Sequence, residues 1–210
     1  MNKGGYLETP EDVIECYVKM IKEAAEEGNV AEARRLLTSV IIAYNDPESK
    51  FLVKLCNELE KAFPLKCPKL GTAFTAYKIC EFADDINYRY ALVELEIPST
   101  VYRSSAFGNK CRCERAIVKS IRPFAIREGV CNNVSSKTYI TRRIEFRLEP
   151  GKIAYSIMSY LYGNDKILEY EVGQEVVADS FDTFRWNACS NGIHFFMTEE
   201  EALNFVIHYF

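Results

Sequence analysis

Two cysteines and a histidine, Cys111, Cys189 and His194, are the side chains of this sequence best suited to covalent chemistry. A thiol becomes a nucleophile when a neighbouring imidazole takes its proton and a carboxylate, here Asp179 or Asp182, orients the imidazole. In the alternative, the thiols fill small apolar gaps and the imidazole bonds a loop carbonyl. An enzyme would require these groups to converge in an open pocket. Because the chain supplies no complete catalytic motif, we favour the non-catalytic interpretation.

The same residue types are the usual ligands of zinc, and Cys111, Cys113, Cys189 and His194 are the candidates. Their spacing argues against a metal site. One residue separates Cys111 from Cys113, whereas structural zinc motifs usually place two to four residues between paired cysteines. Cys189 and His194 have no second pair nearby. The sequence therefore predicts no bound metal, and it indicates no other cofactor.

Residues Gly192-Ile-His-Phe-Phe196 are locally similar to the Gly-Ile-Tyr-Phe strand of ADP-ribosyltransferases, which bind a nicotinamide-bearing substrate. That similarity would give Tyr77 and Glu200 the other catalytic positions. Neither can be aligned with the larger pattern of those enzymes. A buried strand followed by a capped helix explains the same residues, and we favour it.

Arg185 and Trp186 are candidates for binding because a guanidinium beside an indole can stack and form paired hydrogen bonds with a partner. The alternative is structural. In that case the indole closes the end of a sheet and the guanidinium pairs with Asp179 or Asp182. The two interpretations are nearly balanced, and the sequence leaves both open.

A run of positive charge between residues 103 and 119 is opposed by only one acid, Glu114. Such a run could bind nucleic acid or an acidic protein. It is spread over a loop and a strand without interleaved aromatic side chains, which is more typical of a solvated face. We therefore expect no nucleic-acid partner, while these residues remain candidates for binding a protein. The basic residues are Arg103, Lys110, Arg112, Arg115 and Lys119.

The first 66 residues are expected to form about three antiparallel helices. Thr9-Pro10-Glu11-Asp12 supplies an N-cap, a proline in the first turn and acids that suit the helix dipole. Asn45 to Glu48 separates the second helical pattern from the third, and short connections favour antiparallel neighbours. Two prolines, Pro64 and Pro68, end the helical part.

From about residue 70 to 210 the hydrophobic period changes from that of a helix to that of strands. We expect a mainly antiparallel β domain, with a polar loop at 129–136 and a turn or bulge at Gly173-Gln174. A capping box at Thr198-Glu-Glu-Glu201 predicts a closing helix. The fold class is therefore α+β, with an N-terminal helical subdomain at 1–66. The expected strands cover 72–82, 91–97, 115–121, 139–148, 168–177 and 193–197.

The composition is that of a water-soluble globular protein. The 210 residues carry a formal net charge of -4, with a pI near 5.4, which disfavours a phosphate-binding surface over the whole protein. No apolar run reaches the roughly 20 residues that cross a bilayer, and the first residues lack a signal-peptide core. The eight cysteines lie largely in apolar patterns and are expected to be reduced thiols. These features predict a cytoplasmic protein without membrane association.

Short motifs recur in a distinctive order between about Ala73 and Phe205, and they carry a resemblance. The chain resembles an uncharacterised domain of large DNA viruses and bacteriophages that is often attached to pentapeptide repeats. Here a helical region replaces the repeats. The motifs are Thr75-Ala-Tyr-Lys78, Glu94-Leu-Glu-Ile-Pro98, Arg103-Ser-Ser105, Lys110-Cys-Arg112, Ala116-Ile-Val118, Tyr170-Glu-Val-Gly173, Asp179-Ser-Phe-Asp182, Arg185-Trp186, Cys189, Gly192-Ile-His-Phe-Phe196, Thr198, Glu200 and Ala202.

The resemblance implies a fold and a viral context but carries no activity. It implies action in the cytoplasm of a host cell, with association with the virus particle as an alternative. Taken together, these observations favour a non-catalytic module that binds a partner protein. The alternative is an enzyme with a Cys/His site or an NAD-handling domain. The sequence does not indicate the oligomeric state.

Overall fold

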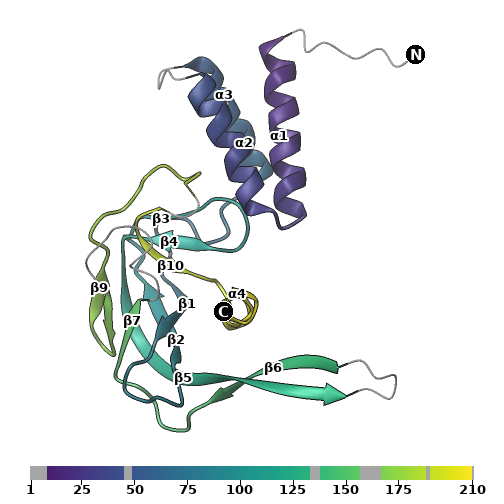
Figure 1. Cartoon of the computed structure of the whole chain (residues 1–210). Helices are drawn as coiled ribbons and strands as arrows, with labels where there is room; N and C mark the ends of the chain where they lie inside the picture. The colour runs from purple at the N-terminus through teal and green to yellow at the C-terminus, as the bar shows by residue number, and fades with distance from the viewer. Residues whose placement is uncertain (1–8, 45–48, 133–137, 157–166, 188–189, 210) are drawn as a thin grey trace. The chain divides into compact units, whose positions relative to one another are not determined.

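A computed structural model of the chain describes residues 9–44, 49–132, 138–156, 167–187 and 190–209. The fold is α+β, as predicted, with three N-terminal helices, antiparallel strands and a C-terminal helix (Figure 1). Two compact units make up the chain. The helical unit comprises Met1–Lys66, Ser105–Lys110 and Thr183–Ser190, and the sheet unit comprises Cys67–Ser104, Cys111–Asp182 and Asn191–Phe210. In the described ranges, no helix has the length and apolar character needed to cross a membrane.

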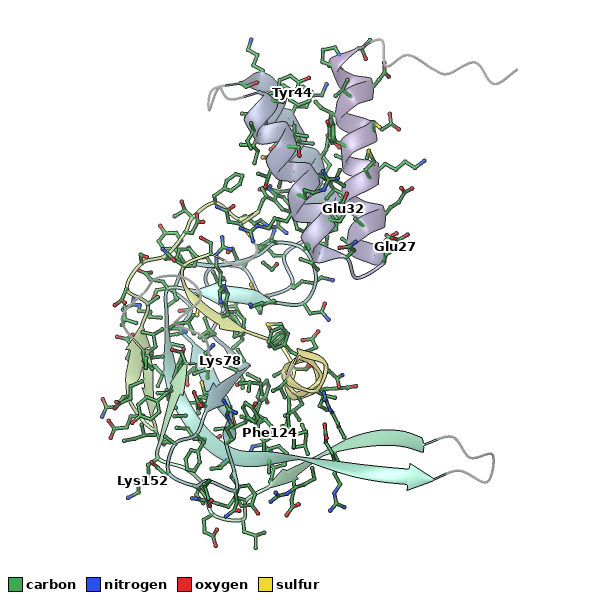
Figure 2. All side chains as sticks on the ribbon, in the orientation of Figure 1. Glu27, Glu32, Tyr44, Lys78, Phe124 and Lys152 are labelled. Atoms are coloured by element: carbon green, nitrogen blue, oxygen red, sulfur yellow. The ribbon has the colours of Figure 1, made fainter. Side chains whose placement is uncertain are left out.

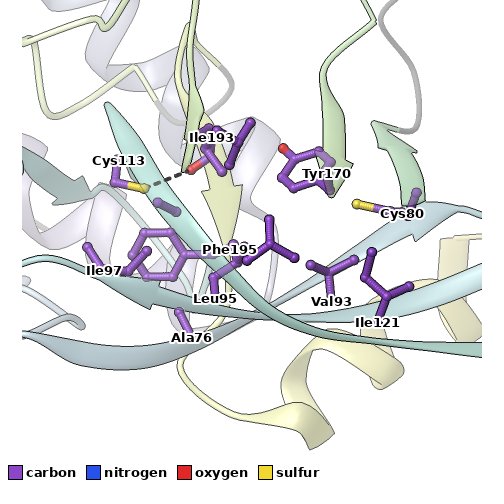
Figure 3. Packing of buried hydrophobic residues seen from close by; sticks show 14 of the residues in the cluster. Ala76, Cys80, Val93, Leu95, Ile97, Cys113, Ile121, Tyr170, Ile193 and Phe195 are labelled. Atoms are coloured by element: carbon purple, nitrogen blue, oxygen red, sulfur yellow. Dashed lines mark hydrogen bonds between the residues drawn. The ribbon is translucent and has the colours of Figure 1, made fainter. Parts of the chain in front are cut away.

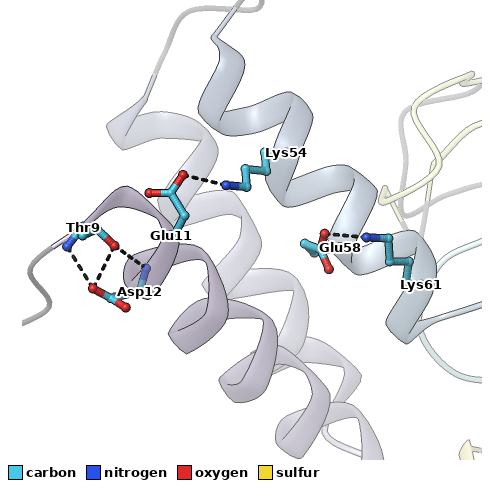
Figure 4. A network of polar contacts seen from close by, with 6 residues as sticks. All are labelled: Thr9, Glu11, Asp12, Lys54, Glu58 and Lys61. Atoms are coloured by element: carbon cyan, nitrogen blue, oxygen red, sulfur yellow. Dashed lines mark hydrogen bonds and ion pairs between the residues drawn. The ribbon is translucent and has the colours of Figure 1, made fainter.

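The helical unit contains α1 (Pro10–Glu26), α2 (Val30–Ala43) and α3 (Lys50–Ala62). The predicted start of the first helix is confirmed. Thr9 Oγ1 accepts a hydrogen bond from the Asp12 N–H at 3.2 Å, and the Asp12 carboxylate accepts one from the Thr9 N–H at 3.0 Å (Figure 4). This capping box satisfies two N–H groups that the helix itself leaves unbonded.

The core of the helical unit is built from helices and from two segments distant in sequence. Leu55 and Leu59 on α3 are completely buried, and they belong to one cluster with Phe107 and Trp186. On the surface, Lys54 of α3 bonds Glu11 of α1 at 2.6 Å (Figure 4). Burial of the apolar stripes stabilises the unit, whereas exposed ion pairs of this kind contribute little.

The sheet unit contains a seven-stranded sheet in the order β6-β5-β2-β1-β7-β8, with β9 pairing with β5, and a three-stranded sheet in the order β10-β4-β3. The helix α4 (Glu199–Tyr209) follows β10. The strands are β1 (Phe74–Glu81), β2 (Tyr90–Ile97), β3 (Arg103–Ser105), β4 (Cys111–Cys113), β5 (Arg115–Asn132), β6 (Thr138–Phe146), β7 (Ile153–Ser156), β8 (Glu169–Glu171), β9 (Glu175–Val177) and β10 (Ile193–Phe195).

The strand β5 is longer than the sequence predicted. Its described end, Asn132, pairs with Thr138 of β6, so the predicted polar loop at 129–136 is wrong for residues 129–132. The remainder of that loop lies outside the described residues. Near its start, the pairing of β5 with β2 shifts between Glu94 and Leu95, which leaves Lys119 as the extra residue of a β-bulge. The turn predicted at Gly173 is confirmed by its positive φ of 86°.

Both faces of the large sheet are covered by apolar groups. One face carries Val93, Leu95 and Ile121 in the main core, which Phe195 of the small sheet completes (Figure 3). The other face carries Phe124 in a second cluster with residues of α4. Lys78 and Phe124, both labelled in Figure 2, belong to these opposite faces. Because successive residues of a strand point to alternate faces, the strands of a sheet that is covered on both faces have nearly continuous apolar sequences.

The closing helix begins as predicted. Thr198 Oγ1 accepts from the Glu201 N–H at 3.2 Å, and the Glu201 carboxylate accepts from the Thr198 N–H at the same distance. Just before this cap, Phe196 and Tyr77 exchange two backbone hydrogen bonds of 2.8 and 2.9 Å. The cap and this bridge position β10 and α4 against β1.

Candidate functional site

The pairing of β4 with β10 decides where the candidate catalytic side chains point. Cys111 lies opposite Phe195, and Arg112 lies opposite His194. Successive side chains of a strand point to opposite faces, so the thiol of Cys111 and the imidazole of His194 lie on different faces of this ladder. The structure therefore does not bring these two groups together. Cys189 lies outside the described residues, and its catalytic role stays a prediction.

Arg112 is the deeply buried cation of this site, with 2% of its surface exposed. Its guanidinium donates a hydrogen bond to the backbone carbonyl of Asp182 at 3.1 Å and lies 5.9 Å from the centre of the Phe181 ring. Asp182 is also held through its backbone, because its N–H donates to Asn191 at 3.3 Å. Arg112 thus fixes the segment that precedes β10 rather than facing solvent.

The thiols of Cys80, Cys111 and Cys113 in the sheet unit are poorly suited to nucleophilic attack. Burial raises the pKa of Cys80 and of Cys113 to about 12. A hydrogen bond with Cys67, together with burial, raises the pKa of Cys111 far above its usual range. Cys113 Sγ lies 3.8 Å from the carbonyl oxygen of Ile193, to which it donates (Figure 3). Since the thiolate is the reactive form, these groups are protonated and unreactive at neutral pH.

A lysine and a tyrosine inside the sheet unit were not among the predicted site residues. Lys78 Nζ donates to the carbonyl oxygen of His194 at 3.3 Å and lies 5.8 Å from the centre of the Tyr170 ring. The Tyr170 hydroxyl is buried without a hydrogen-bond partner among the described residues. Burial raises the pKa of Tyr170 well above its usual value. The sequence feature that could have indicated this site is Lys78 itself, a lysine on the inward side of β1 between Ala76 and Cys80.

Arg103 holds two surface segments together, and we call these segments, residues 69–72 and 98–103, the Arg103 loops. Its guanidinium donates to the carbonyl oxygens of Thr72 at 2.7 Å and Ser99 at 2.6 Å. It also donates to those of Val101 at 2.9 Å and Pro98 at 3.1 Å. Because one charged group bonds four carbonyl oxygens, the backbone of the Arg103 loops is held in a fixed conformation.

Two apolar side chains of the Arg103 loops are exposed. Leu70 is 58% exposed and Tyr102 is 63% exposed. Gly71, which follows Leu70 in the chain, adopts a φ of 102° and donates its N–H to the carbonyl oxygen of Ser99 at 2.8 Å. A left-handed backbone at this position favours glycine, and it lets the first loop close against the second. The Arg103 loops therefore present apolar groups from a fixed backbone.

Arg185 and Trp186 belong to the helical unit. Trp186 is 3% exposed and stacks on Phe107 with ring centroids 5.4 Å apart. Arg185 lies over the Trp186 ring at 4.5 Å and donates to the carbonyl of Ser105 at 2.6 Å, and also to that of Phe63. The indole is buried, so it is not a surface for stacking with a partner. Its ring neighbours, Phe63 and Phe107, belong to the same helical unit.

The basic run between residues 103 and 119 consists largely of cations with partners inside the protein. Arg103 and Arg112 bond backbone carbonyls, as described above. Arg115 pairs with Glu175 at 3.5 Å, and Lys119 pairs with Glu96 at 3.0 Å. Charges neutralised in this way contribute little to phosphate binding. Lys110, the remaining residue of the run, is half-buried in the helical unit.

Metal ligands do not gather at one point among the residues that the structure describes. No group of three His, Cys, Asp or Glu side chains in these ranges could hold a metal ion. Of the two residues that the ADP-ribosyltransferase similarity singled out, Tyr77 is held through its backbone by Phe196, and Glu200 is exposed in the first turn of α4. These positions give that analogy no further support.

Comparison with models of protein families identifies the family of the chain. The model of a family of unknown function, DUF5758, matches residues 63–202. The chain belongs to this family. The DUF5758 match includes the Arg103 loops, the β4–β10 ladder and the Arg185-Trp186 segment, and it begins at the end of the helical N-terminal region. No curated protein and no solved structure matches the chain.

Proposed function

We propose that this DUF5758 protein is a non-catalytic interaction module that binds an apolar segment of a partner protein through the Arg103 loops. The observation that carries the proposal is the exposure of Leu70 and Tyr102 on a backbone that Arg103 fixes through four carbonyl bonds. Tyrosine is enriched among the residues that dominate binding energy, and a fixed loop loses little conformational entropy on binding. The viral resemblance supports action in the cytoplasm of a host cell, or association with the virus particle.

The non-catalytic assignment rests on the groups that could react. The thiols of Cys80, Cys111 and Cys113 are buried and have raised pKa values. The face of the ladder that carries His194 also carries Arg112, which bonds a backbone carbonyl. This arrangement gives the imidazole no thiol from β4 to activate. Of the two predicted nucleophiles, Cys111 and Cys189, a Cys/His enzyme would then need Cys189.

The test is partner capture with matched variants. A photo-crosslinking amino acid in place of Tyr102 should capture a discrete partner from host cells, and the same amino acid in place of Ile86, which is 98% exposed on another loop, should not. The double variant Leu70→Ser/Tyr102→Ala should lose that partner. The control Ile86→Ser/Leu148→Ser removes two other exposed apolar side chains and should keep it.

Thermal unfolding of both double variants checks that the fold is intact, because exposed substitutions change stability little. Equal capture by both double variants would exclude the Arg103 loops as the binding surface. Incubation of the wild-type protein with labelled NAD provides a separate check. Transfer of label, or hydrolysis of NAD, would contradict the non-catalytic assignment.

A further inference from the structure

The outer edge of β6 offers backbone hydrogen bonds that no described strand uses. This strand ends one side of the large sheet. Arg147 donates its N–H to Pro123 of β5 at 2.8 Å, in the register that the two strands share. Backbone groups of an antiparallel strand alternate in direction, so residues 143 and 145 face β5, and residues 142, 144 and 146 face outward. Such an edge is a template for another strand.

The side chains along this edge carry opposite charges in a short alternating pattern. Arg143 lies directly opposite Arg127 of β5, which bonds Glu145 at 3.3 Å. Among the described residues, no carboxylate pairs with Arg143, which is exposed. Like charges opposite each other on a sheet are unfavourable, so Arg143 would gain from an acid on its other side.

We propose that two copies of this chain pair through their β6 edges, antiparallel, about a two-fold axis at Ile144. In this register Ile144 exchanges both backbone hydrogen bonds with Ile144 of the second copy. Arg142 does the same with Phe146 of the second copy. Arg143 then lies opposite Glu145 of the second copy, and symmetry repeats that ion pair on the other side of the axis.

The charge pattern selects this register over its neighbours. An axis at Arg143 would place two copies of Arg143 opposite each other, and an axis at Glu145 would oppose two carboxylates. Of these three axes, the one at Ile144 places opposite charges opposite each other at both positions, and it does so with residues inside β6. Opposite-charge pairs across a ladder are favourable, and like-charge pairs are not.

The partner that fits this edge is a second copy of the chain, because the charge pattern of the β6 edge is complementary to itself. The apolar residues of β6 support the same pairing. Ile144 and Phe146 pack against the cluster that includes Val206 of α4, so pairing about Ile144 would join the clusters of two copies into one apolar face. Arg122 already lies 5.0 Å from the centre of the Phe146 ring, and Arg142 of the second copy would approach the same residue. This surface is separate from the Arg103 loops.

The experiment measures the mass of the full chain in solution by sedimentation velocity over a range of concentrations. The wild type should be dimeric. Arg143→Glu places two carboxylates opposite each other across the dimer, and Glu145→Arg places two guanidinium groups opposite each other. The dimer dissociation constant of each variant alone should therefore rise about tenfold or more. An equimolar mixture of the two variants should restore the dimer as a heterodimer, since each mixed pair then has opposite charges.

Circular dichroism checks that both variants keep the fold, which is expected because Arg143 is exposed and Glu145 is half-buried. A wild type that stays monomeric at all concentrations would overturn the proposal and leave the edge to a strand of another protein. A dimer that persists in both single variants would place the interface elsewhere. Failure of the mixture to restore the dimer would rule out the register about Ile144.

Discussion

Arg112 and His194 lie directly opposite each other across the β4–β10 ladder, on the face that points away from the thiols of Cys111 and Cys113. This pairing separates the predicted nucleophile Cys111 from the imidazole of His194. It also assigns Arg112 a structural role, because its guanidinium bonds the carbonyl of Asp182 at 3.1 Å. The segment that precedes β10 is thus held in place by a buried arginine.

Removal of the Arg112 side chain should destabilise the sheet unit. Arg112→Ala deletes a charge-assisted hydrogen bond, leaves the Asp182 carbonyl with one donor fewer and opens a cavity beside Phe181. We expect a loss of about 2–4 kcal/mol in the free energy of unfolding, measured by urea denaturation. The control Arg115→Ala, which breaks an exposed ion pair with Glu175, should cost about 0–1 kcal/mol. Equal effects of the two variants would contradict a structural role for Arg112.

A side chain at Gly192 should disturb the same site. Its φ is 136°, and an added Cβ would lie 3.2 Å from the carbonyl oxygen of Cys113 and 3.2 Å from the Phe181 ring. We therefore expect Gly192→Ala to lower the free energy of unfolding by about 1–3 kcal/mol. Gly173→Ala is the matched control, because φ there is 86° and nothing lies within 4 Å of the added Cβ. If Gly173→Ala lowered the free energy of unfolding by the same amount, the close contacts at Gly192 would not contribute to the loss of stability.

The buried thiols should make the protein sensitive to alkali. Burial raises the pKa of Cys80 and of Cys113 from 9.0 to about 12, so the folded state keeps protons that the unfolded chain loses. Stability from this source is fully present below pH 9 and is lost as the pH rises towards 12. Each thiol contributes a slope of up to about 1.4 kcal/mol per pH unit in that window.

Urea denaturation at intervals between pH 8 and pH 11 measures that slope. Cys80→Ala removes one of the titrating groups and should make the decline less steep. The control Val53→Ala removes an exposed side chain without a titratable group and should leave the slope unchanged. An unaltered slope in Cys80→Ala would show that this thiol ionises alike in the folded and unfolded states.

The parts of the fold that depend on local patterns could be predicted from the sequence. The cap at Thr9, the three helices, the turn at Gly173 and the step from β10 into α4 follow from neighbouring residues. The length of β5 does not follow from neighbouring residues, because the far end of this strand is defined by its pairing with β6. Gly129 and Asn132 are residue types typical of loops, and the ladder overrides that tendency.

The candidate site was harder to predict because its geometry depends on long-range register. The residue types at Cys111 and His194 suggested a reactive pair, but the pairing of β4 with β10 places them on opposite faces. The role of Trp186 depends on contacts with Phe63 and Phe107, which are distant in sequence. Lys78 could have been noticed as a cation at an inward position, although its partner Tyr170 could not.

The single tryptophan should report the stability of the helical unit. Trp186 is 3% exposed and packs in the cluster that contains Leu55 of α3, so its fluorescence should change when that cluster opens. Leu55→Ala leaves a cavity in the cluster and should lower the free energy of unfolding, followed by tryptophan fluorescence in urea, by about 2–5 kcal/mol. The control Val53→Ala changes a residue of the same helix that is 54% exposed, and it should alter that free energy by less than about 0.5 kcal/mol. If the fluorescence transition were the same in both variants, Trp186 would not share a core with α3.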